Sequence, residues 1–405
     1  MNPTAAPPLT LAIVGAGPVG LALALQVSRL LPGARVTVFD ARPVDAPLEA
    51  DARTLALSLG SVQSLQRLGV WPRIAVRSAP IRAVHVSQQR PALLGLPFGA
   101  GREPVLHIRA EDEGVPQLGA VAGYGAIVGP LQEEWLDACA REPERLSRRC
   151  GTAVQAAKPV PGGVEIDAGV VDTFDLAVIA EGGLYADQER KTLSHRYGQT
   201  AWVGEVTLEG GTRGVAYERF TPHGPAALLP LPDGENGTHR AALVWCVRSD
   251  DDPVLPLDDA QRRTVLDSVF APGTGRIASV SALKAFALGL NAEHRLAQGR
   301  TVRIGNAAQT LHPVAGQGLN LGLRDAHELA TALAQAVDLD AALAHVQRQR
   351  ALDRWVVIAG TDFLARSFTW QWPGLNTLRG LGLAALQAAA PLKSQLARQM
   401  MFGTR

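Results

Sequence analysis

Glycines at three positions have the spacing G-x-G-x-x-G, in the segment Gly15-Ala16-Gly17-Pro18-Val19-Gly20. An apolar run precedes this segment and a helix-forming run follows it, so the motif is expected between a strand and a helix. There, Gly15 permits a tight turn, Gly17 lets the backbone approach a pyrophosphate, and Gly20 lets the helix pack closely on the strand. The phosphates would then meet the free N–H groups at the helix start. The spacing therefore predicts a dinucleotide-binding site.

An acidic residue supports this interpretation. Asp40 ends the expected strand 35–40, twenty residues after the last glycine, where a carboxylate can accept hydrogen bonds from a ribose. We expect the adjacent residues of both turns to contribute to binding, namely Pro18, Val19, Ala41 and Arg42. The alternative is a Gly-rich turn in an ordinary α/β domain. The strand, the helix and the acidic residue all stand at the spacing that the motif requires, and this favours a nucleotide-binding site. The motif leaves open whether that nucleotide is FAD or NAD.

A second Gly-rich segment lies nearly 300 residues further on and reads I-G-N-A-A-Q-T-L-H-P-V-A-G-Q-G-L-N-L-G over 304–322. Its small residues would let the loop lie against a flat ring, and the helix expected from Gly318 could stabilise negative charge on that ring. A reduced flavin carries such a charge. The cofactor-binding residues expected here are Gly305, Asn306, Gly316, Gln317, Gly318, Leu319 and Asn320.

The elements that must position these loops alternate between strand and helix. Residues 9–40 form one βαβ unit, 54–68 and 131–141 have a helical period, and 174–180 is the unalternating strand of a parallel sheet. Recurrent strands between 199 and 247 predict an antiparallel sheet inserted into the α/β domain. From 327 onward the chain is mostly helical. The expected fold class is α/β, with a Rossmann-type nucleotide-binding domain, an inserted antiparallel-sheet substrate domain and C-terminal helices.

Composition excludes several functions for the 405 residues. Lys plus Arg (39) nearly balances Asp plus Glu (38), so no basic field would hold nucleic acid. Three cysteines without C-x-x-C spacing argue against disulfides and against a metal site, and fit a reducing cytoplasm. The uncharged stretch 9–28 is long enough to cross a bilayer, but its central glycines favour a strand, a turn and a helix.

At the second loop the sequence resembles a known family. Residues 305–325 resemble the second flavin motif of the class A flavoprotein monooxygenases, and within them that of the hydroxylases of ubiquinone biosynthesis. Residues 216–231 are similar to the central-domain signature of the same family, and the resemblance covers nearly the whole chain. It implies the p-hydroxybenzoate hydroxylase fold, in which FAD is bound and NAD(P)H docks transiently. Many class A enzymes have Asp at the position of Asn306. An Asn at this position resembles the sequence of the subfamily that acts on 2-polyprenyl-6-methoxyphenol.

The resemblance also implies domain boundaries. Residues 1–75, 101–190 and 286–350 would form three parts of the FAD-binding domain, 76–100 and 191–285 the substrate-domain strands, and 351–405 the C-terminal helices. Ala180-Glu181-Gly182 stands where the family usually has Ala-Asp-Gly, so Glu181 and Gly182 would serve FAD and the visiting nicotinamide nucleotide. Arg53 would contact the FAD phosphates or NAD(P)H, or would instead be a surface residue that caps a helix.

Four residues are candidates for catalysis. By the resemblance, His312 and Pro313 would lie over the flavin, where His312 could relay a proton to or from a phenol, or be a hydrogen-bonded structural group. Tyr217 and Arg219 share one face of an expected strand and Phe220 takes the other. Arg219 could stabilise a phenolate, or be an exposed arginine of the sheet.

These observations predict an FAD monooxygenase that hydroxylates a polyprenylated phenol in ubiquinone biosynthesis, using NAD(P)H and dioxygen through a flavin hydroperoxide. A hydroxylase of soluble phenols is the nearest alternative, and a catalytically weak FAD-binding scaffold of a biosynthetic complex is another, suggested by Glu181. The absence of a G-W-x-W-x-I-P segment disfavours a halogenase. A prenylated substrate must leave the membrane, so the apolar stretch 380–390 is either a core helix or a contact with the membrane surface or with other ubiquinone-biosynthesis proteins.

Overall fold

A mostly parallel six-stranded sheet forms the centre of the nucleotide-binding part of the molecule. The computed structural model describes residues 8–89, 92–93, 96–97, 103–182, 191–270, 272–367 and 375–403. Neighbouring strands in this sheet follow the order β10-β2-β1-β14-β22-β21, and only β21 is antiparallel. Their bounds are β1 (Thr10–Val14), β2 (Arg35–Asp40), β10 (Leu146–Cys150), β14 (Leu176–Ile179), β21 (Ala297–Gln298) and β22 (Thr301–Arg303).

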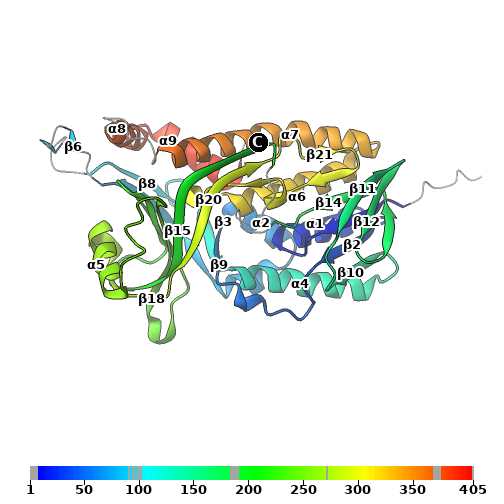
Figure 1. The fold of residues 1–405 in the computed structure, drawn as a ribbon, viewed down its shortest axis with the longest axis horizontal. Coiled ribbons are helices and arrows are strands. Elements are labelled where there is room, and N and C mark those ends of the chain that lie inside the picture. The colour runs from blue at the N-terminus through cyan, green and yellow to red at the C-terminus, as the bar shows by residue number, and fades with distance from the viewer. Residues whose placement is uncertain are drawn as a thin grey trace, which may run out of the picture.

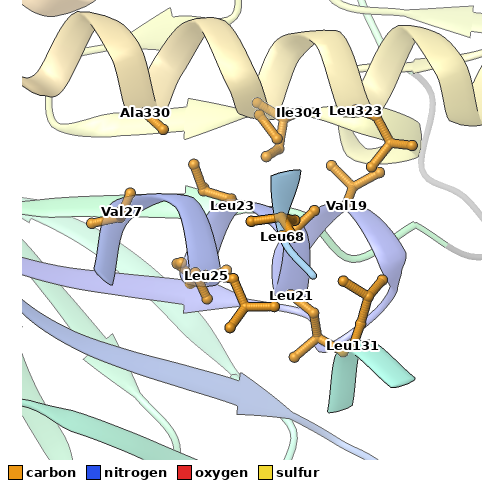
Figure 2. Packing of buried hydrophobic residues seen from close by; sticks show 14 of the residues in the cluster. Val19, Leu21, Leu23, Leu25, Val27, Leu68, Leu131, Ile304, Leu323 and Ala330 are labelled. Carbon is orange, nitrogen blue, oxygen red and sulfur yellow. The ribbon is translucent and has the colours of Figure 1, made fainter. Parts of the chain in front are cut away.

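Helices cover one face of this sheet and a small antiparallel sheet covers the other. α1 (Pro18–Leu30) is apolar on all sides because it lies between the sheet, α4 (Tyr124–Arg141) and α6 (Gly318–Gln335). Figure 2 shows Val19 of α1 directed toward Leu323 of α6, Leu23 directed toward the same helix on the side of Ala330, and Leu131 of α4 on the other side of α1. The opposite face packs on β11 (Ala156–Val160), β12 (Gly163–Asp167) and β13 (Val171–Phe174).

A nine-stranded sheet forms the second part of the molecule, on the left of Figure 1. Its order is β23-β20-β15-β18-β17-β16-β5-β8, and β19 pairs with β15. The strand bounds are β5 (Ala83–Gln88), β8 (Val105–Arg109), β15 (Leu193–Glu209), β16 (Val215–Thr221), β17 (Gly224–Pro230), β18 (His239–Arg248), β19 (Arg276–Val280), β20 (Lys284–Ala292) and β23 (Gln309–Thr310).

The two faces of the nine-stranded sheet have different coverings. The outer face carries Tyr217 and packs against α5 (Asp259–Val269). The inner face carries Ala216 and Phe220, which cluster with Val314 of the second Gly-rich loop. The inner face is therefore the one directed toward the predicted flavin loop.

The remaining elements join the two large sheets. β3 (Thr54–Ser58), β9 (Gly119–Gly123) and β4 (Ser78–Ile81) form a three-stranded sheet, and α2 (Leu59–Arg67) and α3 (Trp71–Ala75) lie between β3 and β4 in the chain. β6 (Ala92–Leu93) pairs with β7 (Leu96–Pro97). α7 (Leu339–Ser367) lies along one side of the molecule, with α8 (Leu375–Ala388) and α9 (Ala390–Phe402) beyond it (Figure 1).

The expected α/β fold class is confirmed, and two local expectations need correction. The helix expected over 54–68 begins at Leu59, because Thr54–Ser58 pairs antiparallel with β9. β8, β20 and β23 belong to the nine-stranded sheet, although β8, β23 and most of β20 fall in segments assigned to the FAD-binding domain. Residues 98–102 and 183–190, which contain two of the expected boundaries, lie outside the described residues.

Neither a membrane span nor a metal site is found in the part of the chain that the structure describes. No described helix combines the length and the apolar character that crossing a bilayer requires. No described group of three or more His, Cys, Asp and Glu side chains is arranged to hold a metal ion.

Candidate functional site

The first glycine turn is tightly packed at two of its three glycines. Gly15 has a φ of 110°, and a Cβ atom there would lie 2.6 Å from the backbone nitrogen of Glu181. A Cβ atom on Gly20 would lie 2.0 Å from the carbonyl oxygen of Gly15. Both glycines are therefore required by the turn itself, whatever it binds.

Gly17 is different because the space beside it is open. A Cβ atom there would meet only the Tyr124 hydroxyl, at 3.8 Å. α1 begins at the next residue, and among the described residues no side chain caps its N-terminus and no acidic residue occupies its first turn. The first backbone N–H groups are thus left to an anion. This open, uncapped helix start is suited to a pyrophosphate.

Asp40 lies at the end of β2, beside this turn. Its carboxylate accepts hydrogen bonds from the Ala16 backbone N–H (2.6 Å) and from the backbone N–H and Nε of Arg42 (2.8 and 3.0 Å). Burial would raise the pKa of Asp40, but the hydrogen bonds and charge of Arg42 outweigh burial and hold the pKa below its usual value. The ionised carboxylate fixes the glycine turn and is placed where a ribose is expected, while Ala41 beside it is exposed.

A tyrosine that the sequence analysis did not identify joins two arginines at the open side of the turn. Tyr124 is buried at the start of α4, and its hydroxyl accepts a hydrogen bond from Arg42 Nη1 (3.3 Å). The Arg53 guanidinium lies 4.7 Å from the centre of the Tyr124 ring and is paired with Asp51. Two guanidinium groups, each paired with an aspartate, therefore lie near Gly17. The sequence signal for this tyrosine was weak: a Gly-Tyr-Gly at a strand–helix junction.

β14 ends at this same turn, as the sequence predicts, but the role expected of Gly182 changes. Glu181 keeps much of its surface exposed, but the protein around its carboxyl group removes part of the solvent. This desolvation, together with the negative charge of Asp40, raises the pKa of Glu181. A Cβ atom on Gly182 would lie 2.2 Å from the Cβ of Asn306. Gly182 therefore gives clearance to the second Gly-rich loop, rather than directly to phosphates.

The two Gly-rich segments come together in space. Gly305 has a φ of 58°, and a Cβ atom there would lie 3.2 Å from Cγ2 of Val19 in α1. A Cβ atom on Gly322 would lie 2.8 Å from the Cα of Gly305. Segments separated by almost 300 residues therefore form one cradle, and Figure 2 shows α1 and α6 packed together beside it.

The start of α6 forms the rest of this cradle. Gly316 has a φ of 58° and ends a 3-10 turn (Pro313–Ala315). Gln317 precedes the helix, and among the described residues no side chain caps the helix start. Gly318 has nothing within 4 Å of a Cβ position, and Leu319 is half-buried. Free N–H groups and open space at this helix start suit the negative charge of a reduced flavin.

His312 is buried and both of its ring nitrogens are occupied. Its Nδ1 accepts a hydrogen bond from the Val314 N–H (3.1 Å), so Nε2 carries the proton and donates to Gln199 Oε1 (2.7 Å). Burial lowers the pKa of His312 to about 3, which keeps the ring neutral. This geometry favours the structural alternative over proton relay. The exposed Pro313 that follows begins the 3-10 turn.

Asn320 is also committed to protein contacts. Its Oδ1 accepts hydrogen bonds from the Ser58 N–H and the Ser61 hydroxyl (2.7 Å each), and its Nδ2 donates to the carbonyls of Ala56 and Gly316 (2.9 Å each). The side chain is therefore directed toward the β3–α2 junction. Asn320 clamps the start of α6 to that junction and has no hydrogen-bonding capacity left for a flavin.

Tyr217 and Arg219 lie on the outer face of the nine-stranded sheet, and Phe220 lies on the inner face. Arg219 is buried, paired with Glu103, and donates from Nε to the carbonyl of Val269 (2.8 Å). The Tyr217 hydroxyl donates to the carbonyl of Gly273 (3.0 Å). These contacts connect the outer face to the α5 region, so we do not assign Arg219 to phenolate stabilisation.

The cradle fits FAD. Gly17 leaves room for a pyrophosphate, and Arg42 and Arg53 place guanidinium N–H donors nearby. Asp40 is placed for a ribose, and the start of α6 is open to a charged ring. The second loop then places Val314 between this cradle and the inner face of the large sheet. A substrate held on that face would meet the ring end of the cofactor.

Comparisons with known proteins agree with this geometry. A family model described as an FAD binding domain matches residues 189–352. Ubiquinone hydroxylase UbiL of Rhodospirillum rubrum is 31% identical over 402 residues, covering 96% of this chain and 88% of that protein. The 3-demethoxyubiquinol 3-hydroxylase of Escherichia coli is 29% identical over 406 residues, covering 96% and 97%.

The fold also matches a solved flavoprotein. Klebsiella pneumoniae HpxO, solved with FAD and uric acid, superposes with a TM-score of 0.71 at 18% identity, covering 98% of this chain and 97% of that one. At that identity the match shows the fold, and the Rhodospirillum relative shows the family. The chain therefore belongs to the ubiquinone-biosynthesis hydroxylases, a family of class A FAD-dependent monooxygenases.

Proposed function

We propose that this protein hydroxylates the ring of a polyprenylated phenol on the route to ubiquinone, with NAD(P)H as electron donor and dioxygen as oxygen source. The observation that carries the proposal is the single cradle formed by the two Gly-rich segments, facing the inner face of the large sheet. The first substrate to test is 2-polyprenyl-6-methoxyphenol, because Asn306 matches that subfamily. Demethoxyubiquinol is the second, because the Escherichia coli relative is named for it.

The residues of the chain would bind, orient and shield the reactants. Bound FAD would supply the transfer of electrons from NAD(P)H to dioxygen and of one oxygen atom to the ring. The open helix start at Gly17, with Arg42 and Arg53 nearby, would hold the pyrophosphate, and the start of α6 would stabilise negative charge on the ring. The apolar inner face would hold the phenol and exclude water.

Oxidation of NAD(P)H by the purified, FAD-loaded protein tests the proposal. Prenylated phenol should stimulate oxidation, with one hydroxylated product formed per equivalent of reductant consumed. Hydroxylation of unprenylated phenols at the same efficiency would support the alternative of a hydroxylase for soluble phenols. FAD binding without substrate-stimulated oxidation, with every phenol tested, would support the scaffold alternative, for which Glu181 remains the sequence argument.

Contact with the membrane surface or with other ubiquinone-biosynthesis proteins is part of the proposal, because a prenylated phenol partitions into lipid. Leu381 of α8 and Leu392 of α9 are 55% and 56% exposed, and Lys393 lies next to the latter. Flotation with vesicles of anionic phospholipid should recover the protein, and Leu392→Ser should reduce that recovery. No recovery with any vesicle would contradict the membrane contact.

A further inference from the structure

A carboxyl group lies among apolar side chains on the inner face of the large sheet. Glu218 occupies the middle of β16, between Ala216 and Phe220 on the same face. Its partners across the sheet are Ala227 of β17 and Val86 of β5. Glu218 therefore lies on the face directed toward Val314 and the flavin loop.

The surroundings of Glu218 are apolar over several strands. Val244 is the partner of Ala227 on β18, Val203 of β15 is the partner of Val244, and Leu106 of β8 is the partner of Val86. All of them share the face of Glu218, because directly paired residues project to the same side of a sheet. A phenol with an isoprenoid tail would find mainly hydrocarbon here, and this one carboxyl group beside it.

The carboxyl group has no partner in the described parts of the chain. No hydrogen bond or ion pair joins its oxygens to any described residue, whereas Arg219, one residue away, is paired with Glu103 on the opposite face. Glu218 lies deep in the protein, yet its side chain keeps accessible surface. Glu218 is therefore largely withdrawn from bulk water without being fully enclosed. A buried polar group without a hydrogen-bond partner is costly, so a ligand that hydrogen-bonds to this carboxyl group would stabilise it.

We propose that Glu218 receives the hydroxyl group of the phenol substrate, accepts its hydrogen bond, and takes its proton as the ring is hydroxylated. This inference rests on the proposed function. In the transfer, the phenol O–H bond breaks, its electron pair stays on the phenol oxygen, and a new O–H bond forms on the carboxylate. The resulting phenolate has the more electron-rich ring, which reacts more readily with an electrophilic oxygen.

The acidity of Glu218 suits this step. Burial raises the pKa of Glu218 to about 8, much closer to that of a phenol than an ordinary glutamate would be. A general base acts best when its pKa lies near the working pH. Below that pKa the carboxyl group is protonated in the free protein, so proton acceptance should increase as the pH rises through about 8.

The ionisable groups near Glu218 do not account for a pH dependence near pH 8. His85, His107 and Arg219 project from the opposite face. Burial raises the pKa of the Cys246 thiol and lowers that of His312 to about 3, so both are neutral near pH 8. The other charged groups described on the inner face or on α9 are Lys284 and five ion pairs, Glu205–Arg240, Glu209–Arg276, Arg248–Asp250, Lys393–Asp112 and Arg398–Glu113. Burial alone accounts for the raised pKa of Glu218, so these charges act little on it.

Binding experiments test the proposal without requiring turnover. The FAD-loaded protein is titrated with a short-chain prenylated phenol and with its O-methyl ether, between pH 6 and 9, with calorimetry as the readout. Wild type should prefer the phenol increasingly as the pH rises through about 8. Glu218→Gln should lose roughly 10- to 100-fold of affinity for the phenol, the value of a hydrogen bond to a charged group, and should bind the ether about as before. Glu218→Asp should keep part of the pH dependence.

The surface variant Glu209→Gln, on β15 of the same sheet and paired with Arg276, is the matched control and should behave as wild type. If Glu218→Gln keeps the preference for phenol over ether and its pH dependence, the proposal is overturned. Loss of the preference in a protein that hydroxylates no phenol would support the site while refuting the proposed function. Where turnover is observed, the rise of kcat/KM near pH 8 should disappear in Glu218→Gln.

Discussion

Asn320→Asp should destabilise the protein, because the change removes two hydrogen-bond donors from a buried clamp. The amide donates to the carbonyls of Ala56 and Gly316 and accepts from Ser58 and Ser61. A carboxylate of the same shape keeps the two accepted bonds but turns an oxygen toward the two carbonyls. Side-chain size is unchanged, so packing is not the cause of any effect.

The size of the effect follows from the two carbonyls left without donors. A buried polar group without its partner costs about 1–3 kcal/mol, so two such groups should lower the free energy of unfolding by about 2–6 kcal/mol near neutral pH. Electrostatic repulsion from the carbonyls should raise the pKa of the new carboxyl group in the folded state. A protonated carboxyl group donates one hydrogen bond, so the loss should be smallest below pH 4 and grow as the pH rises through the raised pKa.

Urea denaturation at several pH values measures this loss. The control is Asn236→Asp, at an exposed turn position with a φ of 57°, where aspartate is tolerated and the expected change is within about 0.5 kcal/mol. The hydrogen-bond values set the lower limit of the expected loss well above about 1 kcal/mol. If the free energy of unfolding of Asn320→Asp lies within about 1 kcal/mol of the wild-type value at neutral pH, Asn320 does not clamp the start of α6. A loss that is independent of pH would also refute the clamp.

Substitutions at three further positions probe the cradle. Gly17→Val should fold, since a Cβ atom there meets only the Tyr124 hydroxyl at 3.8 Å, but should lose the visible absorbance of FAD after reconstitution because its side chain fills the pyrophosphate space. Retained FAD would place the phosphates elsewhere. Gly182→Leu should lower both thermal stability and FAD affinity because it collides with Asn306, and a stable yellow variant would contradict that packing. Glu181→Asp should match or exceed wild type in stopped-flow flavin reduction by NAD(P)H, while Glu181→Ala should be slower. Equal rates in all three proteins would show that Glu181 only faces solvent.

The first glycine turn could be predicted because its requirements are local. The spacing of Gly15, Gly17 and Gly20 after an apolar strand specifies a turn and a helix start, and β1, α1 and β2 lie where expected. The start of α6 at Gly318 and the end of β14 before Glu181 follow from similar local signals.

Long-range pairing explains the expectations that failed. Thr54–Ser58 has a helical period but pairs with β9, some 65 residues away, which overrides local propensity. The alternation of Tyr217, Arg219 and Phe220 was predicted, but which face meets the flavin loop depends on the packing of α5 on one side and Val314 on the other. Tyr124 reaches the cradle only because α4 packs beside α1.

The hydrogen-bonding roles of individual side chains were also beyond the sequence. His312 is a candidate for catalysis or a structural role, and Asn320 for cofactor binding, yet each uses its polar atoms for partners within the protein, some of them distant in sequence. Gly182 borders Asn306 rather than open space. A loop His, Asn or Gly is equally compatible with a role at the cofactor and with a structural role. Only the tertiary contacts distinguish these two roles.

The most direct test of the central claim is isotope incorporation by the purified, FAD-loaded protein, supplied with NAD(P)H, a prenylated phenol and ¹⁸O₂. The account predicts a product that carries one added oxygen atom, derived from the gas, in an amount that matches the reductant consumed in coupled turnover. A folded protein that cannot be loaded with FAD, or a product whose new oxygen comes from water, would contradict it.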